Sequence, residues 1–247
     1  MKALRNLLAS CSLLFALILP ASAGQTEVIN AGVNGNNSRQ LLARLDSAVI
    51  AHQPDVVVIG GGTNDAINSR NAIELDEYLT NVQTMVEQCR EAGLDVVLIT
   101  AIPCVDSYVL QRHPASFFKG RAPSVKVQAY VESLLNLGKK LNVPVINLYE
   151  LYRENGEIGE GESSWIQNEA NSGRRDGVHP TAVGYKAIAE AVYQSLAIRS
   201  VAPARIICLG DSITFGAGAR TKETDDSYPA RLSALLSAQK LPESGGH

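Results

Sequence analysis

Short apolar runs alternate along the chain with segments whose apolar positions recur every three or four residues. The short runs are rich in Val and Ile, which predicts buried β-strands; they cover residues 28–30, 56–59, 96–100, 143–148 and 205–209. The helical periodicity predicts helices over residues 38–52, 75–92, 125–141, 181–197 and 228–240. Strands that alternate with helices favour a parallel sheet covered on both faces, so we predict a three-layer α/β/α sandwich with a five-stranded sheet.

The first residues have the three sections of a secretory signal peptide. Lys2 and Arg5 precede an apolar run over residues 7–19, and small residues end the segment at Ala23. We therefore predict a signal peptide over residues 1–23, one domain over residues 24–247, and export to the periplasm or the medium. The apolar run is too short for a comfortable membrane span, so we expect no stable membrane insertion. Cleavage at Cys11, as in a lipoprotein, is a disfavoured alternative because most of the apolar run would stay on the product.

The composition suits a single globular domain that binds neither nucleic acid nor an anionic membrane. Hydrophobic residues make up 45% of the chain, enough for a sizeable core. Cleavage after Ala23 would leave 20 basic against 25 acidic residues, and this mild acidity disfavours polyanionic partners. Cys89, Cys104 and Cys208 would remain, without metal-type spacing, so at most one disulfide could form.

Glycine-rich turns follow three of the predicted strands, where parallel sheets form their binding sites. These turns cover residues 31–37, 60–65 and 210–212, and a fourth polar segment, residues 176–180, precedes the helix predicted from residue 181. Because the carboxyl ends of parallel strands meet at one edge of a sheet, the four segments can converge. Together they supply a serine, an Asp-x-x-His pair and two glycine turns, which are the parts needed for acyl transfer.

Ester cleavage requires a distinct role from each polar residue in these segments. Ser212 is too weakly acidic to attack unaided, so His179 is the candidate general base that takes its proton. Asp176 would hold the other ring nitrogen of that histidine and stabilise the imidazolium. The tetrahedral oxyanion needs donors, for which we predict the backbone N–H groups of Ser212 and Gly35 and the side-chain amide of Asn64.

Other residues fit this chemistry less well. His113 is the other candidate base, but it has no acid at a comparable spacing. Asp65 and Asp211 are predicted to fix turns by accepting backbone hydrogen bonds. The chain has no Gly-x-Ser-x-Gly elbow, phosphate-binding loop or His-Glu-x-x-His motif, so we expect neither a metal nor a cofactor.

The segments "GDSIT", "NAGVNGNN", "GGTND" and "DGVHPTAVGY" resemble the four sequence blocks of the SGNH (GDSL-type) hydrolase family. Members of that family are esterases, thioesterases, lysophospholipases and carbohydrate acetylesterases built on a flavodoxin-like sheet. The resemblance implies the same roles for Ser212, His179, Asp176, Gly35 and Asn64 as the chemistry above.

The order of the blocks departs from the family pattern, in which the serine block comes first. Here it comes last, which predicts a circular permutation of the fold. The strand over residues 205–209 should then lie inside the sheet, between the strands over residues 28–30 and 56–59. We expect a monomer; the competing arrangement is a swapped dimer in which Ser212 completes the site of a second chain.

The substrate is less visible in the sequence than the chemistry. Two long connections, residues 104–123 and 151–175, carry aromatic side chains and either form walls of the pocket or only cover the surface. An exported enzyme with such loops suits a small-molecule or glycan ester that carries a short acyl or acetyl group, for example an O-acetylated carbohydrate. The alternatives are a thioesterase or lysophospholipase acting on longer acyl chains, and an inactive carbohydrate-binding module.

Overall fold

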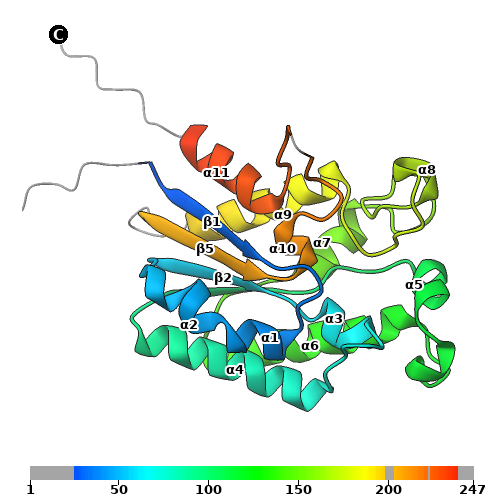
Figure 1. Cartoon of the computed structure of the whole chain (residues 1–247), viewed down its shortest axis with the longest axis horizontal. Helices are drawn as coiled ribbons and strands as arrows, with labels where there is room; N and C mark the ends of the chain where they lie inside the picture. The colour runs from blue at the N-terminus through cyan, green and yellow to red at the C-terminus, as the bar shows by residue number, and fades with distance from the viewer. Residues whose placement is uncertain (1–24, 198–202, 222, 239–247) are drawn as a thin grey trace, which may run out of the picture.

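The structure is a computed structural model that describes residues 25–197, 203–221 and 223–238 (Figure 1). Within these residues, five parallel strands form one sheet in the order β1-β5-β2-β3-β4. Their bounds are β1 Glu27–Gly32, β2 Val56–Gly60, β3 Asp95–Ile99, β4 Val145–Ile146 and β5 Arg205–Gly210. The predicted signal peptide, the connection over residues 198–202 and the predicted helix end at residue 240 lie outside the described residues.

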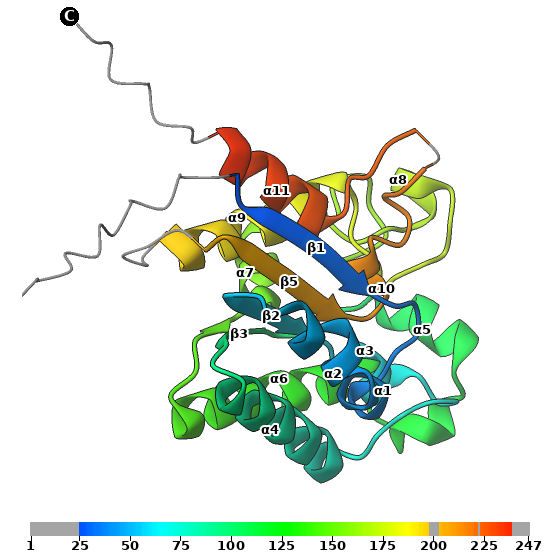
Figure 2. The ribbon, with the colours of Figure 1, turned by 60° about the vertical axis from the view of Figure 1, so that its left-hand side comes forward.

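The last strand along the chain, β5, lies inside the sheet (Figure 2). It pairs with β1 from Glu27 opposite Arg205 to Gly32 opposite Gly210, and it pairs with β2 on its other side. The predicted central position of this strand is therefore confirmed. The two ends of the described chain also meet, because the Nε2 of Gln25 donates a 2.6 Å hydrogen bond to the Oγ of Ser237.

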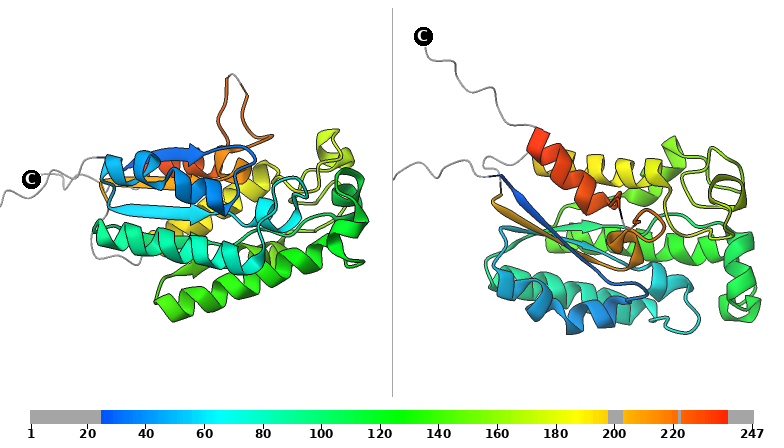
Figure 3. Two further views of the ribbon diagram at one scale, coloured as in Figure 1. Left: turned by 60° about the horizontal axis from the view of Figure 1, so that its bottom comes forward. Right: turned by 45° about the horizontal axis from the view of Figure 1, so that its top comes forward.

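Two layers of helices cover the sheet, because successive residues of a strand point to opposite faces (Figure 3). Val57 and Ile207 face one layer, and Val58 and Cys208 face the other. The first layer contains α1 Ser38–Ala43, α2 Leu45–Ala48, α4 Leu75–Glu91 and α6 Pro123–Leu141. The second contains α7 Leu148–Asn155, α9 Ala182–Ala197 and α11 Tyr228–Ala238. The predicted three-layer α/β/α architecture is confirmed.

The single helix predicted over residues 38–52 is wrong, because the segment divides into α1, α2 and the 3₁₀ turn η1 Ile50–His52. The first break falls at Arg44, whose backbone has left the helical region with φ −111° and ψ 7°. Its guanidinium donates to the carbonyl of Gly210 at 2.8 Å and to the side-chain oxygen of Asn36 at 2.8 Å. The first bond connects the break to the end of β5, and the second connects it to the turn that follows β1.

The strand predicted over residues 143–148 is shorter in the structure, because β4 spans only Val145–Ile146. Asn147 ends it by capping α7, since its side-chain oxygen accepts from the N–H of Glu150 at 3.1 Å. Five short elements are additional to the prediction: α3 Thr63–Ile67, α5 Asp106–Arg112, η2 Ala115–Phe118, α8 Glu169–Ser172 and α10 Ser212–Phe215. Each has fewer than eight residues, too few to display a helical period.

The cysteines contribute to the core rather than to cross-links. Cys89, Cys104 and Cys208 are buried and free. Over the residues that the structure describes, none of the helices is both long and apolar enough to cross a membrane.

Candidate active site

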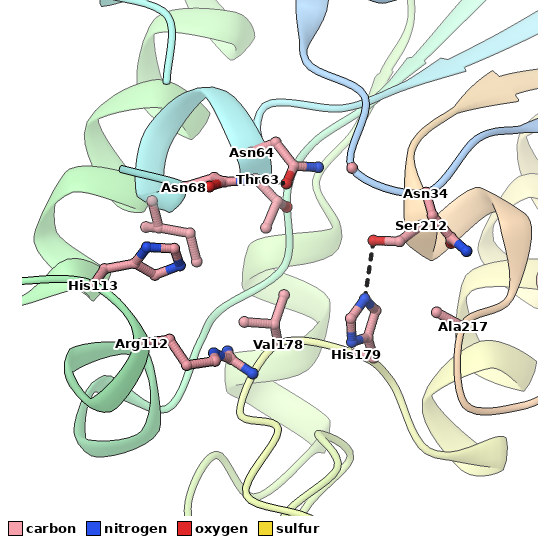
Figure 4. Close-up of a pocket in the computed structure, with 12 residues that line it drawn as sticks. Asn34, Thr63, Asn64, Asn68, Arg112, His113, Val178, His179, Ser212 and Ala217 are labelled. Carbon is pink, nitrogen blue, oxygen red and sulfur yellow. Dashed lines mark hydrogen bonds between the residues drawn. The ribbon is translucent and has the colours of Figure 1, made fainter. Parts of the chain in front are cut away.

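Three strand ends and one loop bring the predicted site residues together at the carboxyl edge of the sheet. β1 leads into the turn that contains Gly35, β2 leads into α3 with Asn64, and β5 leads directly into α10, which begins at Ser212. His179 lies on the loop before α9, and its ring points at the serine (Figure 4). All of these residues line one cavity.

A continuous set of polar contacts links Asp176, His179 and Ser212. The Nε2 of His179 lies 2.9 Å from the Oγ of Ser212. The Nδ1 of the same ring lies 2.8 Å from Oδ2 and 3.0 Å from Oδ1 of Asp176. Both distances are normal for hydrogen bonds, so one imidazole bridges a hydroxyl and a carboxylate. This arrangement can move a proton from the serine to the histidine.

The loop that carries Asp176 and His179 is held by its own carboxylate. The Oδ1 of Asp176 accepts the backbone N–H of Val178 at 2.9 Å and that of His179 at 2.7 Å. Burial raises the pKa of Asp176, but the hydrogen bond and charge of His179 and the two backbone donors outweigh burial and lower the pKa to about 2. The carboxylate is therefore ionised at neutral pH and fixed against the imidazole.

Ser212 owes its position to a tight junction between β5 and α10. Asp211 caps the helix, because its Oδ1 accepts the N–H of Ile213 at 2.9 Å. Gly210 has no room for a side chain: a Cβ there would lie 2.9 Å from the carbonyl oxygen of Gly60 and closer still to Thr214. The strand can therefore turn into the helix directly against β2, and Ser212 stands at the first helical position.

The two buried aspartates fix turns, as predicted. Asp211 caps α10, and Asp65 accepts the backbone N–H of Ser38 at 2.9 Å through its Oδ1. Burial raises the pKa of Asp65, against hydrogen bonds to Ser38 that lower it. Burial also raises the pKa of Asp211, to about 6, despite the backbone bond from Ile213 and the charge of His179.

The three residues predicted to supply oxyanion donors, Gly35, Asn64 and Ser212, all line this cavity. Gly35 adopts φ 77°, a conformation that favours glycine, and no atom lies within 4 Å of where its Cβ would be. Among the hydrogen bonds within the described residues, none uses the backbone N–H of Gly35 or of Ser212. The Nδ2 of Asn64 donates to the carbonyl of Asn36 at 3.0 Å and lies 3.4 Å from Asp211 Oδ2. Its second hydrogen is thus only weakly engaged.

The cavity beside Ser212 has a volume of about 360 Å³. It is lined by Asn34, Gly35, Thr63, Asn64, Ile67, Asn68, Arg112, His113, Val178, His179, Ser212 and Ala217. The segment over residues 104–123, for which wall and surface cover were both predicted alternatives, contributes Arg112 and His113. The segment over residues 151–175 contributes none of these residues, which favours the alternative that it only covers the surface. Its aromatic side chains pack together instead, with the ring centroids of Tyr152 and Trp165 5.4 Å apart.

His113 lies in the same cavity but does not form a second set of catalytic contacts. Its Nδ1 lies 2.9 Å from the Oγ of Ser69, and among the described residues no carboxylate contacts its ring. The sequence pointed to His113 as a rival base and as part of a possible pocket wall, but it did not point to Arg112, its neighbour in the same segment. In the part of the chain that the structure describes, no cluster of three or more His, Cys, Asp and Glu residues is placed to hold a metal ion.

The sequence model of the GDSL-like Lipase/Acylhydrolase family matches residues 12–187, well over half of the chain. The chain belongs to this family. The resemblance drawn from its four sequence blocks is thereby confirmed at the level of the family, which comprises esterases and acylhydrolases. The matched segment contains Gly35, Asn64, Asp176 and His179, and it ends before Ser212.

Three curated relatives are similar to this family member over part of their length. The uncharacterized lipoprotein YqeF of Bacillus subtilis (strain 168) is 22% identical over 148 residues, 56% of this chain and 61% of that protein. An acetylxylan esterase of Geobacillus stearothermophilus is 32% identical over 80 residues, 30% of this chain and 36% of that protein. Thioesterase 1/protease 1/lysophospholipase L1 of Escherichia coli (strain K12) is 25% identical over 167 residues, 67% of this chain and 64% of that protein. The chain thus spans less than two thirds of each.

A solved structure has the same fold as this chain. The crystal structure of the acetyl xylan esterase AlAXEase is similar with a TM-score of 0.53 and 19% sequence identity, and the match covers 67% of this chain and 79% of that one. The likeness extends to the five-stranded parallel sheet with helices on both faces.

Proposed function

We propose that this family member is a serine esterase that hydrolyses carboxylic esters through an acyl-enzyme intermediate. The observation that carries the proposal is the set of contacts from Asp176 through His179 to Ser212, at 2.8 and 2.9 Å. A hydroxyl within hydrogen-bond reach of an imidazole, itself oriented by a carboxylate, is the arrangement that activates serine as a nucleophile.

In the first half of the reaction, the Oγ of Ser212 attacks the carbonyl carbon of the ester while its proton passes to the Nε2 of His179. Asp176 stabilises the imidazolium that forms and holds the ring in place. The oxyanion accepts hydrogen bonds from the backbone N–H groups of Ser212 and Gly35 and from the Nδ2 of Asn64. The weak 3.4 Å contact of that amide to Asp211 gives way to the oxyanion.

The intermediate collapses when His179 gives its proton to the leaving alcohol. The C–O bond to the alcohol breaks, and the acyl group stays on Ser212. A water molecule then attacks the acyl carbon, with His179 again as base, and releases the carboxylic acid and the free serine. Apart from the substrate and that water molecule, these steps use only side chains and backbone groups of this chain.

A short acyl group, such as the acetyl group of a carbohydrate ester, is the substrate that we favour. The modest cavity of about 360 Å³ supports a short acyl chain, and the similarity to an acetylxylan esterase supports an acetylated glycan. The similarity to a thioesterase and lysophospholipase supports the second candidate, hydrolysis of longer acyl chains. A series of 4-nitrophenyl esters from acetate to decanoate distinguishes the two: kcat/KM should decline beyond butyrate for the first candidate and rise for the second.

We also propose that residues 24–247 form one exported, circularly permuted domain that acts as a monomer. The position of β5 between β1 and β2 and the bond between Gln25 and Ser237 support the permutation. The sequence pattern over residues 1–23 supports export, and the lipoprotein relative keeps cleavage at Cys11 as the alternative. Mass spectrometry of the processed N-terminus distinguishes cleavage after Ala23 from a lipid-modified Cys11.

The experiment that tests the esterase combines turnover with labelling of the nucleophile. The full chain should hydrolyse 4-nitrophenyl acetate and should gain the mass of one fluorophosphonate label, located by peptide mapping on Ser212. Ser212→Ala should lose both, while Ser47→Ala, which alters an exposed serine, should keep both. An unlabelled, inactive but folded wild-type chain would refute the esterase and leave the carbohydrate-binding module.

A further inference from the structure

The wall of the cavity opposite Ser212 carries positive charge and no negative charge. Arg112 and His113 reach into the cavity from that side (Figure 4). No aspartate or glutamate occurs among the described residues that line the cavity, although the whole chain has more acidic than basic residues. The formal charge of the cavity lining is therefore positive, while the carboxylate of Asp176 lies behind the lining and is bonded to His179.

The guanidinium of Arg112 is not compensated by a carboxylate. Several other arginines of the described chain, such as Arg39 and Arg205, pair with a glutamate at 2.6 Å. No ion pair or hydrogen bond within the described residues uses the guanidinium of Arg112. The acid of its own helix, Asp106, is occupied by the backbone N–H and hydroxyl of Ser124, both at 2.7 Å. Arg112 thus lines the cavity with all of its donors available.

His113 adds a second donor, because its tautomer is determined by its surroundings. The backbone N–H of Ser69 donates to the Nδ1 of His113 at 3.3 Å, and a backbone N–H can only donate. Nδ1 is therefore the acceptor, and the hydrogen of the neutral ring is on Nε2. Burial, helped by the charges of Arg112 and Arg70, lowers the pKa of His113, so the ring is neutral at physiological pH.

We infer that this end of the cavity is a binding subsite for a carboxylate group of the substrate, held by the guanidinium of Arg112 and the Nε2–H of His113. A site with several N–H donors, one full positive charge and no acceptor carboxylate matches a carboxylate, which only accepts. The inference rests on the proposed function, because the carboxylate belongs to the ester that Ser212 cleaves. It deepens that function by adding a negative charge to the substrate.

The carboxylate can belong to either side of the ester bond, and two matched pairs of chromogenic esters distinguish the two sources. On the acyl side, 4-nitrophenyl hemisuccinate differs from 4-nitrophenyl butyrate by a carboxylate in place of a methyl group. On the alcohol side, 4-acetoxybenzoate differs from 4-acetoxybenzamide by a carboxylate in place of an amide. The rate with folded Ser212→Ala is subtracted in each case, because a hemisuccinate also hydrolyses itself.

The measured quantity is the ratio of kcat/KM for the anionic ester to kcat/KM for its neutral partner. In one of the two pairs, Arg112→Gln should lower this ratio about tenfold to a hundredfold, the range typical of a lost hydrogen bond to a charged group. Arg112→Lys should restore part of it. Lys140→Gln, which removes an exposed positive charge in the last turn of α6, should leave the ratio unchanged. A ratio that does not respond to Arg112→Gln in either pair would overturn the inference.

A binding measurement keeps the inference testable without turnover. Isothermal titration calorimetry on folded Ser212→Ala compares ethyl hemisuccinate with ethyl butyrate, and 4-acetoxybenzoate with 4-acetoxybenzamide. The anionic member of one pair should bind more tightly, and adding Arg112→Gln should remove the difference. Equal binding within both pairs would overturn the subsite. If the wild-type chain hydrolysed none of the four esters of the kinetic experiment, that result would instead contradict the proposed function. The two failures are therefore distinct.

Discussion

Replacing Asp211 with asparagine should stabilise the folded chain more at pH 8 than at pH 4. The side chain is buried, with 2% of the residue exposed, and it directly precedes Ser212. Burial raises the pKa of its carboxyl group from 3.8 to about 6, although the N–H of Ile213 favours the charged form. The ionised carboxylate therefore lowers the free energy of unfolding, whereas a neutral side chain in the same place would not.

The folded chain loses the proton of Asp211 at a higher pH than the unfolded chain does, and this difference sets the sign of the effect on stability. Well below pH 4 the carboxyl group of Asp211 is protonated in the folded and the unfolded chain, so it adds no cost. Between about pH 4 and pH 6 the unfolded chain ionises first, and the free energy of unfolding falls as the pH rises. Above pH 6 the full cost is present. The rise from 3.8 to about 6, at about 1.4 kcal/mol for each pKa unit, gives about 3 kcal/mol.

Asparagine retains the shape of Asp211 and one oxygen for the N–H of Ile213, but it cannot ionise. Its amide would face the Nδ2 of Asn64, which lies 3.4 Å from the Oδ2 of Asp211, and two facing donors cost about 1 kcal/mol at any pH. Subtracting the effect of the substitution at pH 4 from its effect at pH 8 removes this constant cost. About 0.5 kcal/mol of the ionisation cost is already present at pH 4, so the remaining difference is an expected gain somewhat below about 3 kcal/mol.

Urea unfolding at the two pH values, followed by circular dichroism, measures the gain. In thermal unfolding the same free energy corresponds to a rise of about 6–12 °C in Tm for a domain of this size. Asp46→Asn, which removes an exposed carboxylate, serves as the control for the change in net charge and should show no such difference. A difference below about 1 kcal/mol, or one of opposite sign, would refute the assignment of a raised pKa to Asp211.

Three further predictions concern the site and the order of the chain. Asn64→Ala should lower kcat roughly a hundredfold to a thousandfold by removing one oxyanion donor; reduced stability with normal turnover of the folded fraction would indicate a structural role instead. Asp176→Asn should lower kcat on the order of ten thousandfold, because an amide no longer holds the tautomer of His179 that accepts the serine proton, and near-normal steady-state turnover would contradict that role. A rearranged chain that begins near Ala202, joins the present tail to Gln25 and stops near Ser200 should fold and hydrolyse the same esters; failure of the folded chain to turn over would count against the permutation.

The strands and long helices could be predicted because each strand contains a short apolar run and each long helix shows a helical period in its own residues. β2 contains only buried positions, and α6 runs over nineteen residues from a proline at its start to two lysines at its end. The break at Arg44 could not be predicted, because it depends on the carbonyl of Gly210, which lies 166 positions away in the sequence. A helical pattern reflects only the local preference of the residues and contains no information about a partner so distant in the sequence.

Some residues of the candidate site could likewise be predicted from the sequence, and others could not. Ser212 and His179 could be named because the proposed nucleophile and base follow turns that carry recognisable residues, and their side chains lie 2.9 Å apart. Arg112 could not, because an exposed arginine at a helix end has no local mark that distinguishes a cavity wall from solvent. The direction in which α5 presents that side chain is a property of the packed loop and not of its sequence alone.

The position of β5 between β1 and β2 has a consequence for the order of events during synthesis. The ribosome produces β1 and β2 long before β5, yet in the described sheet β1 pairs with no other strand. Until the last strand arrives, β1 lacks a neighbour and β2 has an open edge, so closure waits for contacts between distant parts of the chain. The same strand ends two residues before Ser212. A polypeptide that stops before β5 therefore lacks both the pairing that joins β1 to β2 and the serine proposed as the nucleophile.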